Sequence, residues 1–280
     1  MLFIVDDGFG MEDEQRQLAE QLADFVTFAE AQALDYRIAV TSADLQDEDG
    51  RFVPLPEAGP AANRIVTPET EPSPVDVLGA NVRLGSRSRG APRLFDALVT
   101  ALSAPRLLGH NTGFRRPGAA LTVVAVTDGD DASLGGGAAV AAAFLRSVVG
   151  PEGTATFSAI AGGPEGCADP AGAAEPSPRL VDLVARTGGT LGSVCTPDWS
   201  RTLEDVSREA FGFRSRFFLS NPPDPATVEV FVDEERLPDV ETSGRINWTF
   251  DEDASAVDFT PLTVPAPGAA IRVEYSPACE

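Results

Sequence analysis

The chain has 280 residues, of which 43% are hydrophobic, and its formal net charge is −22 at pH 7. This length and apolar content suffice for one large hydrophobic core or two smaller ones, which excludes a chain that is disordered throughout. The negative charge excludes binding to nucleic acids or anionic membranes through a general electrostatic field, and it favours cations and basic partners.

The first predicted element is a buried strand at residues 2–5, which ends at Asp6 and Asp7. Its four apolar residues suit a central parallel strand that is covered by helices on both faces. A glycine-rich loop with Gly8 and Gly10 follows, and then an acidic helix start. In open α/β sheets, ligands bind outside the carboxyl ends of such strands, so the polar residues of this loop are candidates for a binding site.

Strands and helices alternate through most of the chain, which predicts a doubly wound, mostly parallel α/β sheet. A turn at residues 47–50 is expected within a hairpin whose returning edge strand is residues 63–67, and residues 68–76 are expected to lack regular structure. Further strands are predicted at residues 36–41, 119–127, 154–161 and 190–194, and helices at residues 12–29, 92–102, 137–149, 179–187 and 199–211.

The character of the sequence changes at the proline-rich residues 221–225. From there on the patterns predict only short strands, at residues 228–232, 246–250, 256–259 and 270–275. We therefore expect an α/β domain over residues 1–216 and a small antiparallel β unit over residues 217–280. A unit of about 60 residues buries little surface alone, so we expect it to pack on the α/β domain.

Two further loops join the first as parts of a candidate site. Asp128 follows the predicted strand at residues 119–127 as Asp6 follows the first strand, so the two acidic strand ends are expected to lie side by side. The loop at residues 84–90 lies between them along the chain and carries two hydroxyl and two basic side chains, those of Ser86, Ser88, Arg87 and Arg89.

Other motifs favour less specific interpretations. Asp128, Asp130 and Asp131 lack the alternation and terminal glutamate of an EF-hand, so we interpret them as a solvated acidic turn. His110 is the only histidine, and no serine lies in a G-x-S-x-G motif, which argues against a nucleophilic hydrolase. We therefore expect no enzymatic activity.

With the three loops in this order, residues 2–215 resemble a von Willebrand factor A domain. The resemblance is closest to bacterial A-domain proteins of the myxobacterial type. It rests on residues 35–41, residues 111–116, the pairs Gly166-Cys167 and Val194-Cys195 around residues 187–189, and a β-rich tail. It implies a non-enzymatic role in binding or adhesion to a protein partner.

The resemblance also implies a disulfide and a compartment. The three cysteines by number alone fit either one disulfide with a leftover thiol or three reduced thiols. The resemblance implies a Cys167–Cys195 disulfide and does not say whether Cys279 is paired. It further implies an exported or surface-anchored protein, such as a lipoprotein, whose export signal lies outside this sequence. A cytoplasmic protein is the alternative.

A domains typically carry a metal-ion-dependent adhesion site (MIDAS), in which a D-x-S-x-S loop, a threonine and a further aspartate hold Mg²⁺ or a similar cation. Mg²⁺ prefers about six oxygen ligands, and in this family one position is left for a carboxylate of the partner. Since glycine has no side-chain oxygen, the resemblance implies a degenerate site that binds metal weakly or not at all. Asp6 takes the first aspartate position, Gly8 and Gly10 stand at the two serine positions, Ser86 is the candidate for the threonine position, and Asp128 takes the third-loop aspartate position.

Two functional hypotheses from different classes follow. In the first, the chain is a monomeric module that recognises a protein partner, with or without an acidic ligand group on that partner. A divalent cation gives little or no help. The binding loop residues are Asp7, Gly8, Gly10, Arg87, Arg89 and Asp130. In the second, the chain is a scaffold protein without a working metal site, the glycines only turn the chain, and Asp6 caps the following helix.

Overall fold

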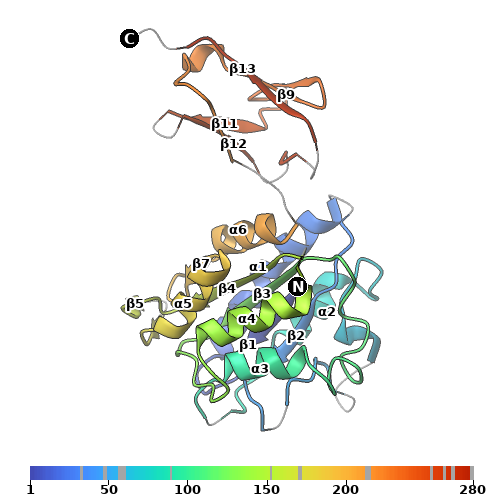
Figure 1. Ribbon diagram of the computed structural model, residues 1–280. Coiled ribbons are helices and arrows are strands. Elements are labelled where there is room, and N and C mark those ends of the chain that lie inside the picture. The colour runs from blue at the N-terminus through green and yellow to red at the C-terminus, as the bar shows by residue number, and fades with distance from the viewer. Residues whose placement is uncertain are drawn as a thin grey trace. The chain divides into compact units, whose positions relative to one another are not determined.

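The computed structural model of the protein describes residues 1–31, 34–46, 49–55, 61–88, 90–151, 153–169, 172–211, 216–252, 255–260, 263–265 and 269–277. The chain divides into two compact units, Met1–Ala210 and Phe211–Glu280. The arrangement of helices and strands within each unit is shown in Figure 1.

The first unit is built on a five-stranded sheet in the order β2-β1-β3-β4-β7. All neighbouring strands run parallel, which confirms the predicted doubly wound α/β fold. The chain places β2 on one side of β1 and β3 on the other. In open α/β sheets, ligands bind outside the carboxyl ends of the strands at such a reversal of strand order. The strands are β1 (Leu2–Val5), β2 (Ala39–Ser42), β3 (Leu121–Val126), β4 (Ala155–Ala161) and β7 (Leu191–Ser193).

Helices cover both faces of this sheet, and Figure 1 shows α3 and α4 in front of it and α1 behind it. Leu2 and Ile4 of β1 pack in one core with residues of α3, α4 and α5, and the alternation of side chains along a strand sends Phe3 and Val5 to the opposite face. Among the described residues, no helix has the length and apolar character needed to cross a membrane. The helices of this unit are α1 (Glu12–Ala31), α2 (Pro74–Asn81), α3 (Leu94–Ala101), α4 (Ala138–Val149), α5 (Pro178–Thr187) and α6 (Ser200–Phe211).

Two sequence predictions for the segment between β2 and α3 were wrong. Residues 68–76 do not all lack regular structure, because α2 begins at Pro74, where Ser73 caps the helix and accepts a hydrogen bond from the Asp76 backbone N–H. Proline fits the first turn of a helix. Residues 63–67 form no strand: a short 3₁₀ helix, η1 (Ala61–Arg64), precedes a single antiparallel bridge between Val66 and Ile38. Of the turn predicted there, residues 47–48 lie outside the described residues.

The second unit consists of two three-stranded antiparallel sheets, with the strand orders β10-β9-β13 and β11-β12-β8. Its core includes Val230, Trp248 and Val257, and the Trp248 indole N–H donates to the Leu237 carbonyl, which joins the two sheets. β8 and β10 were missed by the sequence analysis, and the packing of this unit on the α/β unit stays a prediction. The unit comprises β8 (Arg216–Phe218), η2 (Pro225–Thr227), β9 (Glu229–Val232), β10 (Glu235–Leu237), β11 (Trp248–Asp251), β12 (Ala256–Phe259) and β13 (Ile271–Glu274).

Candidate functional site

Asp6 lies at the carboxyl end of β1, directly beside the end of β3. Its carboxylate accepts hydrogen bonds from the Thr127 hydroxyl at 2.7 Å and from the Gly8 backbone N–H at 2.7 Å. The side chain is buried, and burial raises the pKa of Asp6 from 3.8 to about 6, with a further contribution from the negative charge of Asp128. The protein thus supplies donors to both oxygens of the carboxylate that the A-domain resemblance assigns to the metal.

Asp7 points into the protein rather than toward solvent. Its carboxylate accepts a hydrogen bond from the Ser42 hydroxyl at 2.7 Å, at the end of β2. Its backbone carbonyl accepts from the N–H groups of Arg87 and Ser88 at 2.9 and 3.0 Å. Burial raises the pKa of Asp7. Asp7, which the sequence placed in the binding loop, therefore joins that loop to β2 and to the loop at residues 84–90.

Ser86 and Gln15 complete this connection between the loops. The Ser86 hydroxyl donates to the Gly8 carbonyl at 3.2 Å. Gln15 is buried in the first turn of α1, and its amide donates to the carbonyls of Asp6 and Gly85 while its oxygen accepts from the Gly85 N–H. The structure therefore brings Ser86 to the first loop, as the resemblance implies, and it holds the two loops together through a residue that the sequence analysis missed.

The third loop begins with Thr127 and Asp128. Thr127 orients the Asp6 carboxylate and itself accepts a hydrogen bond from the Gly129 N–H. The Asp128 carboxyl is half-buried, and burial raises its pKa, with a further contribution from the negative charge of Glu175. Asp6 and Asp128 thus lie at adjacent strand ends, as predicted from the order of the motifs.

The acidic turn after Asp128 is not simply solvated, which corrects the interpretation from sequence. The Asp130 carboxylate accepts from the backbone N–H groups of Arg179 and Leu180 at the start of α5. Asp131 is buried, accepts from the Phe95 N–H at 2.9 Å and pairs with Arg179 at 2.9 Å. Both carboxylates therefore satisfy the first turns of helices, where orphan N–H groups and the helix dipole favour negative charge.

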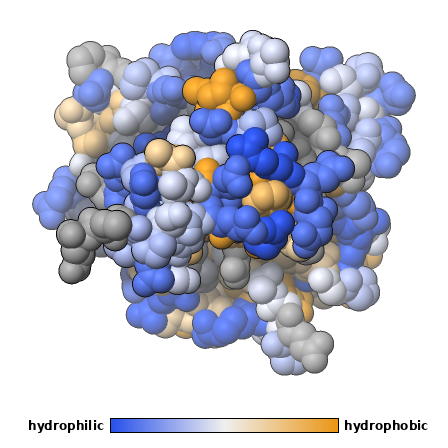
Figure 2. Space-filling model, turned by 90° about the horizontal axis from the view of Figure 1, so that it is seen from above, coloured by the Kyte–Doolittle hydropathy of each residue, from blue (hydrophilic) through white to orange (hydrophobic). Residues whose placement is uncertain are grey.

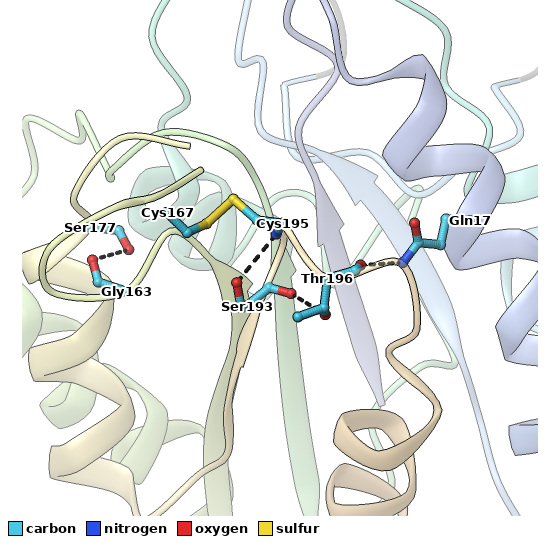
Figure 3. The surroundings of a disulfide bond; sticks show 7 residues. All are labelled: Gln17, Gly163, Cys167, Ser177, Ser193, Cys195 and Thr196. Atoms are coloured by element: carbon cyan, nitrogen blue, oxygen red, sulfur yellow. Dashed lines mark hydrogen bonds between the residues drawn. A yellow bond between two sulfur atoms is a disulfide. The ribbon is translucent and has the colours of Figure 1, made fainter. Parts of the chain in front are cut away.

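A disulfide joins the segments that follow β4 and β7 at the carboxyl edge of the sheet. Cys167 and Cys195 are bonded, which confirms the pairing that the resemblance implies, while Cys279 lies outside the described residues. Cys167 begins a hairpin of β5 (Cys167–Asp169) and β6 (Gly172–Ala174), which the sequence analysis missed, and Cys195 follows β7. Figure 3 shows the bond beside a second chain of contacts, in which Thr196 accepts from Gln17 of α1. The hairpin also reaches the third loop, because the Glu175 N–H donates to the Asp128 carbonyl at 2.9 Å.

The described residues do not fit a resident Mg²⁺ ion well. Asp6 is already engaged by two protein donors, the Ser86 hydroxyl donates to a carbonyl, and the glycines at positions 8 and 10 provide no side-chain oxygen. Across the part of the chain that is described, no group of three or more His, Cys, Asp or Glu side chains is placed to hold a metal ion. A cation at this edge would depend largely on Asp6, Asp128 and water.

Restoring the two serines of the MIDAS motif is expected not to restore tight Mg²⁺ binding. A Cβ at Gly8 would lie 2.9 Å from the Asp6 carboxylate oxygen, and Gly10 has φ +105°, a conformation that strains any L residue. Gly8→Ser with Gly10→Ser should therefore lower the stability by about 1–3 kcal/mol and leave the Mg²⁺ affinity within about threefold of its original value. Calorimetric titration and thermal unfolding measure both effects.

Gly137→Ser serves as the matched control for this double variant. Gly137 has an ordinary negative φ, stands before α4, and has open space where a side chain would go. Serine is favoured at this position in front of a helix, so stability should be kept or raised. A tenfold gain in Mg²⁺ affinity in the double variant would show that the remaining ligands are correctly placed, and it would contradict our interpretation.

His110 does not belong to the site. Its ring Nε2 lies 2.9 Å from the Phe52 carbonyl oxygen, and burial lowers its pKa. Within the described part of the chain, the ring is hydrogen-bonded to this backbone carbonyl rather than to a serine or a carboxylate. The arrangement therefore offers no Ser-His-Asp triad. Arg89 lies outside the described residues, and the Arg87 side chain is exposed.

Comparisons with known proteins give likeness at the level of structure only. No family model and no curated protein matches the sequence. Among solved structures, the chain is similar to proximal thread matrix protein 1 from the mussel byssus with a zinc-occupied MIDAS motif, with a TM-score of 0.46 and 13% identity over 75% of this chain and 44% of that chain. It is also similar to the pilus adhesin SpaC from Lactobacillus rhamnosus GG, with a TM-score of 0.46 and 9% identity over 98% of this chain and 38% of that chain.

The chain thus spans less than half the length of the structures it matches. At these identities the likeness says nothing of the metals or partners of this chain. The fold class rests instead on the strand order and on the parallel pairing. Together they form the doubly wound α/β architecture that the resemblance to von Willebrand factor A domains implies.

Proposed function

We propose that this chain is a non-enzymatic binding module that recognises a protein partner through the loops that follow β1, α2 and β3, with weak or no dependence on a divalent cation. The observation that carries this proposal is the state of Asp6, whose two carboxylate oxygens are held by the Thr127 hydroxyl and the Gly8 N–H. The loops keep their mutual arrangement through protein contacts, so a metal ion is not needed to organise them.

The rigidity of these loops supports a binding role. Gln15, Ser86 and the carbonyl of Asp7 join the first loop to the second, and Thr127 joins the first to the third. A surface that is ordered before its partner arrives loses less conformational entropy on binding than a mobile surface does. The same contacts would be unnecessary in a scaffold protein whose carboxyl edge has no ligand.

An extracytoplasmic location is part of this proposal. Disulfides form and persist in oxidising compartments and are rare in the cytoplasm of most organisms. The Cys167–Cys195 bond ties the hairpin of β5 and β6 to the exit of β7, and this supports an exported or surface-anchored protein. The export or anchoring device itself is proposed from the resemblance and has no counterpart among the described residues.

Metal titration tests the proposed independence from divalent cations. Because the described protein ligands are so few, metal-stripped protein should bind Mg²⁺ and Mn²⁺ only with dissociation constants of about 1 mM or weaker. Isothermal titration calorimetry of the original chain and of Asp6→Ala measures this directly. Binding that is at least a hundredfold tighter and disappears in Asp6→Ala would show that the depleted site still works as a metal-dependent adhesion site.

Affinity capture from the envelope and secreted fractions of the native source tests the binding role. Immobilised original chain and Asp128→Arg are compared, and Glu234→Arg in the turn between β9 and β10 provides the matched control. We expect a defined protein that the original and Glu234→Arg chains retain and that Asp128→Arg loses. Equal capture by all three chains would show that the binding surface lies outside these loops, and it would favour the scaffold hypothesis.

A further inference from the structure

Among the residues that the structure describes, Phe9 is the most exposed large hydrophobic side chain, with 95% of its surface accessible to solvent. Phenylalanine is among the residues most often buried in folded proteins. Phe9 lies in the first loop, between Gly8 and Gly10, and therefore beside Asp6 and Asp7 of the site described above. A fully exposed aromatic residue at such a place calls for a physical explanation.

The backbone on both sides of Phe9 is fixed. The Gly8 N–H donates to Asp6, and the Gly8 carbonyl accepts from the Ser86 hydroxyl and from the Met11 N–H at 3.3 Å. Gly8 also forms a parallel bridge with Ser88, and the side chain of Met11 is fully buried. The loop therefore holds the Phe9 ring out in solvent, although its backbone is anchored on either side.

A second apolar side chain stands at the same edge of the sheet. Leu134 is 84% exposed and lies in the loop that follows β3, the strand next to β1. Its backbone N–H and that of Gly135 donate to the Asp96 carboxylate, which fixes this loop as well. Phe9 and Leu134 are thus two separately anchored apolar points at the carboxyl edge. The face drawn in Figure 2, by contrast, is mainly hydrophilic with small scattered hydrophobic spots.

The surroundings of these two points are acidic on balance, although they include the exposed Arg87, whose backbone N–H donates to the Asp7 carbonyl. Carboxylates follow every one of the four strands β1 to β4, whereas several of the arginines near this edge are already paired within the chain, as in Arg16–Asp13, Arg93–Asp96 and Arg179–Asp131. The half-buried or exposed carboxylates that follow these strands include those of Glu12, Asp13, Asp44, Asp128, Asp130, Glu165 and Glu175.

Charge complementarity decides which partner suits this surface. An acidic ligand group, which the A-domain resemblance implies, would meet repulsion here unless a cation lay between the two surfaces. Lysine or arginine side chains on the partner would be attracted instead, and like-charged partners would be rejected. An anionic bilayer is disfavoured for the same reason, since peripheral membrane-binding segments carry basic rather than acidic residues around their apolar anchors.

We propose that Phe9 is the anchor of the interface, that it inserts into an apolar pocket of a protein partner whose rim carries lysine or arginine, and that Leu134 makes a second apolar contact. The proposal rests on the proposed function, because it names the kind of partner that the same loops recognise. A rigidly presented aromatic side chain on a polar surface has the properties of an interface hot spot.

The test uses a surface-displayed library of a small folded scaffold with a randomised concave face, selected on the full chain without counter-selection. Enriched clones are then measured against the original chain, Phe9→Ala, Leu134→Ala and Asp128→Arg. Leu108→Ala is the matched control, because Leu108 is 78% exposed and lies in the segment that precedes β3. Since Phe9 and Leu108 are both exposed, both alanine variants should keep the original unfolding temperature.

We expect the enriched clones to be rich in lysine and arginine, to lose about thirtyfold in affinity for Phe9→Ala, and to bind Leu108→Ala unchanged. A selection in which no enriched clone depends on Phe9 overturns the proposal. If enriched clones that do not depend on Phe9 lose binding to Asp128→Arg, only the role of Phe9 is wrong and the proposed function stands. If their affinity is unchanged by both Phe9→Ala and Asp128→Arg, the proposed function fails too. Sedimentation with phosphatidylcholine vesicles that is lost in Phe9→Ala would overturn the proposal in favour of a membrane partner.

Discussion

Replacing Cys167 and Cys195 by serine is expected to lower the free energy of unfolding of the α/β unit by about 3–4 kcal/mol. The two cysteines are 28 residues apart in the sequence, and a cross-link that closes a loop of this length removes much conformational entropy from the unfolded chain. Its loss should also free the hairpin of β5 and β6, which otherwise holds the loop of Asp128 through the Glu175 N–H.

Urea unfolding followed by tryptophan fluorescence measures this effect. Trp199 is buried in the α/β unit and Trp248 in the second unit, so a Trp248→Phe background confines the signal to the unit that carries the disulfide. Cys279→Ser is the control, because Cys279 is not part of the Cys167–Cys195 bond, and it should leave the midpoint unchanged. A double variant that loses less than about 1 kcal/mol would mean that the disulfide contributes little to stability.

The contribution of Asp6 to the stability of the α/β unit is expected to grow as the pH falls from 7 to 5, because burial raises the pKa of Asp6 to about 6. In the unfolded chain this pKa returns to 3.8, so the folded state binds a proton first as the solution is acidified. The contribution of Asp6 to the free energy of unfolding is fully present below pH 3.8, and it is lost as the pH rises through 6. It amounts to about 3 kcal/mol in total, of which roughly half is gained by pH 5.

Other groups modify this pH dependence in known directions. Burial also raises the pKa values of Asp7, Asp128 and Asp131, which adds to the stabilisation at low pH. The pKa of Asp96 is lowered by the Leu134 N–H, the Arg93 side chain and the Gly135 N–H, which outweigh its desolvation, so Asp96 opposes the trend. Burial lowers the pKa of His110, which opposes it as well. Burial also lowers the pKa of the Met1 ammonium from 8.0 to about 5, so acidification from pH 7 to 5 costs stability at this group too. The contribution of Asp6 must therefore be isolated by substitution.

Asp6→Asn isolates this contribution. The free energy of unfolding is measured at pH 7 and pH 5 in the presence of a chelator, with Trp199 as the reporter. The change in the free energy of unfolding on acidification should be about 1.4 kcal/mol less favourable in Asp6→Asn than in the original chain. Glu165→Gln, which removes an exposed carboxyl, should preserve the original pH dependence. An equal change in the free energy of unfolding between pH 7 and pH 5 in the original chain and in Asp6→Asn would show that Asp6 titrates near its ordinary pKa.

These experiments distinguish two views of the carboxyl edge. If Asp6 titrates with a raised pKa and the metal-stripped protein binds Mg²⁺ weakly, the loops are organised by the protein itself. Their specificity then lies in Phe9, Leu134 and the surrounding carboxylates. If Mg²⁺ binds tightly and lowers the pKa of Asp6, the edge works in the manner of an adhesion site that lacks its serines, and an acidic partner group becomes the better expectation.

Much of the architecture follows from local sequence patterns. Apolar strands that alternate with amphipathic helices predict the doubly wound sheet, because each pattern reports which face of an element must be buried. The secondary-structure predictions were wrong where local sequence signals conflict or where the element is very short. Three prolines at residues 68–76 obscured the helix that begins at Pro74, and the short strands β5, β6, β8 and β10 have too few residues to show a period.

By itself, the amino-acid sequence determined the parallel sheet, the two acidic strand ends and the glycines that remove MIDAS oxygens, and its resemblance to A domains implied the Cys167–Cys195 pair. Only the tertiary structure decided which contacts the polar residues of this edge make. It placed Thr127 against Asp6, 121 residues away, and directed Asp130 and Asp131 to the starts of helices. It also left Phe9 exposed. Such contacts depend on which distant segments meet and on which side chains the packing leaves in solvent, and no local pattern records either.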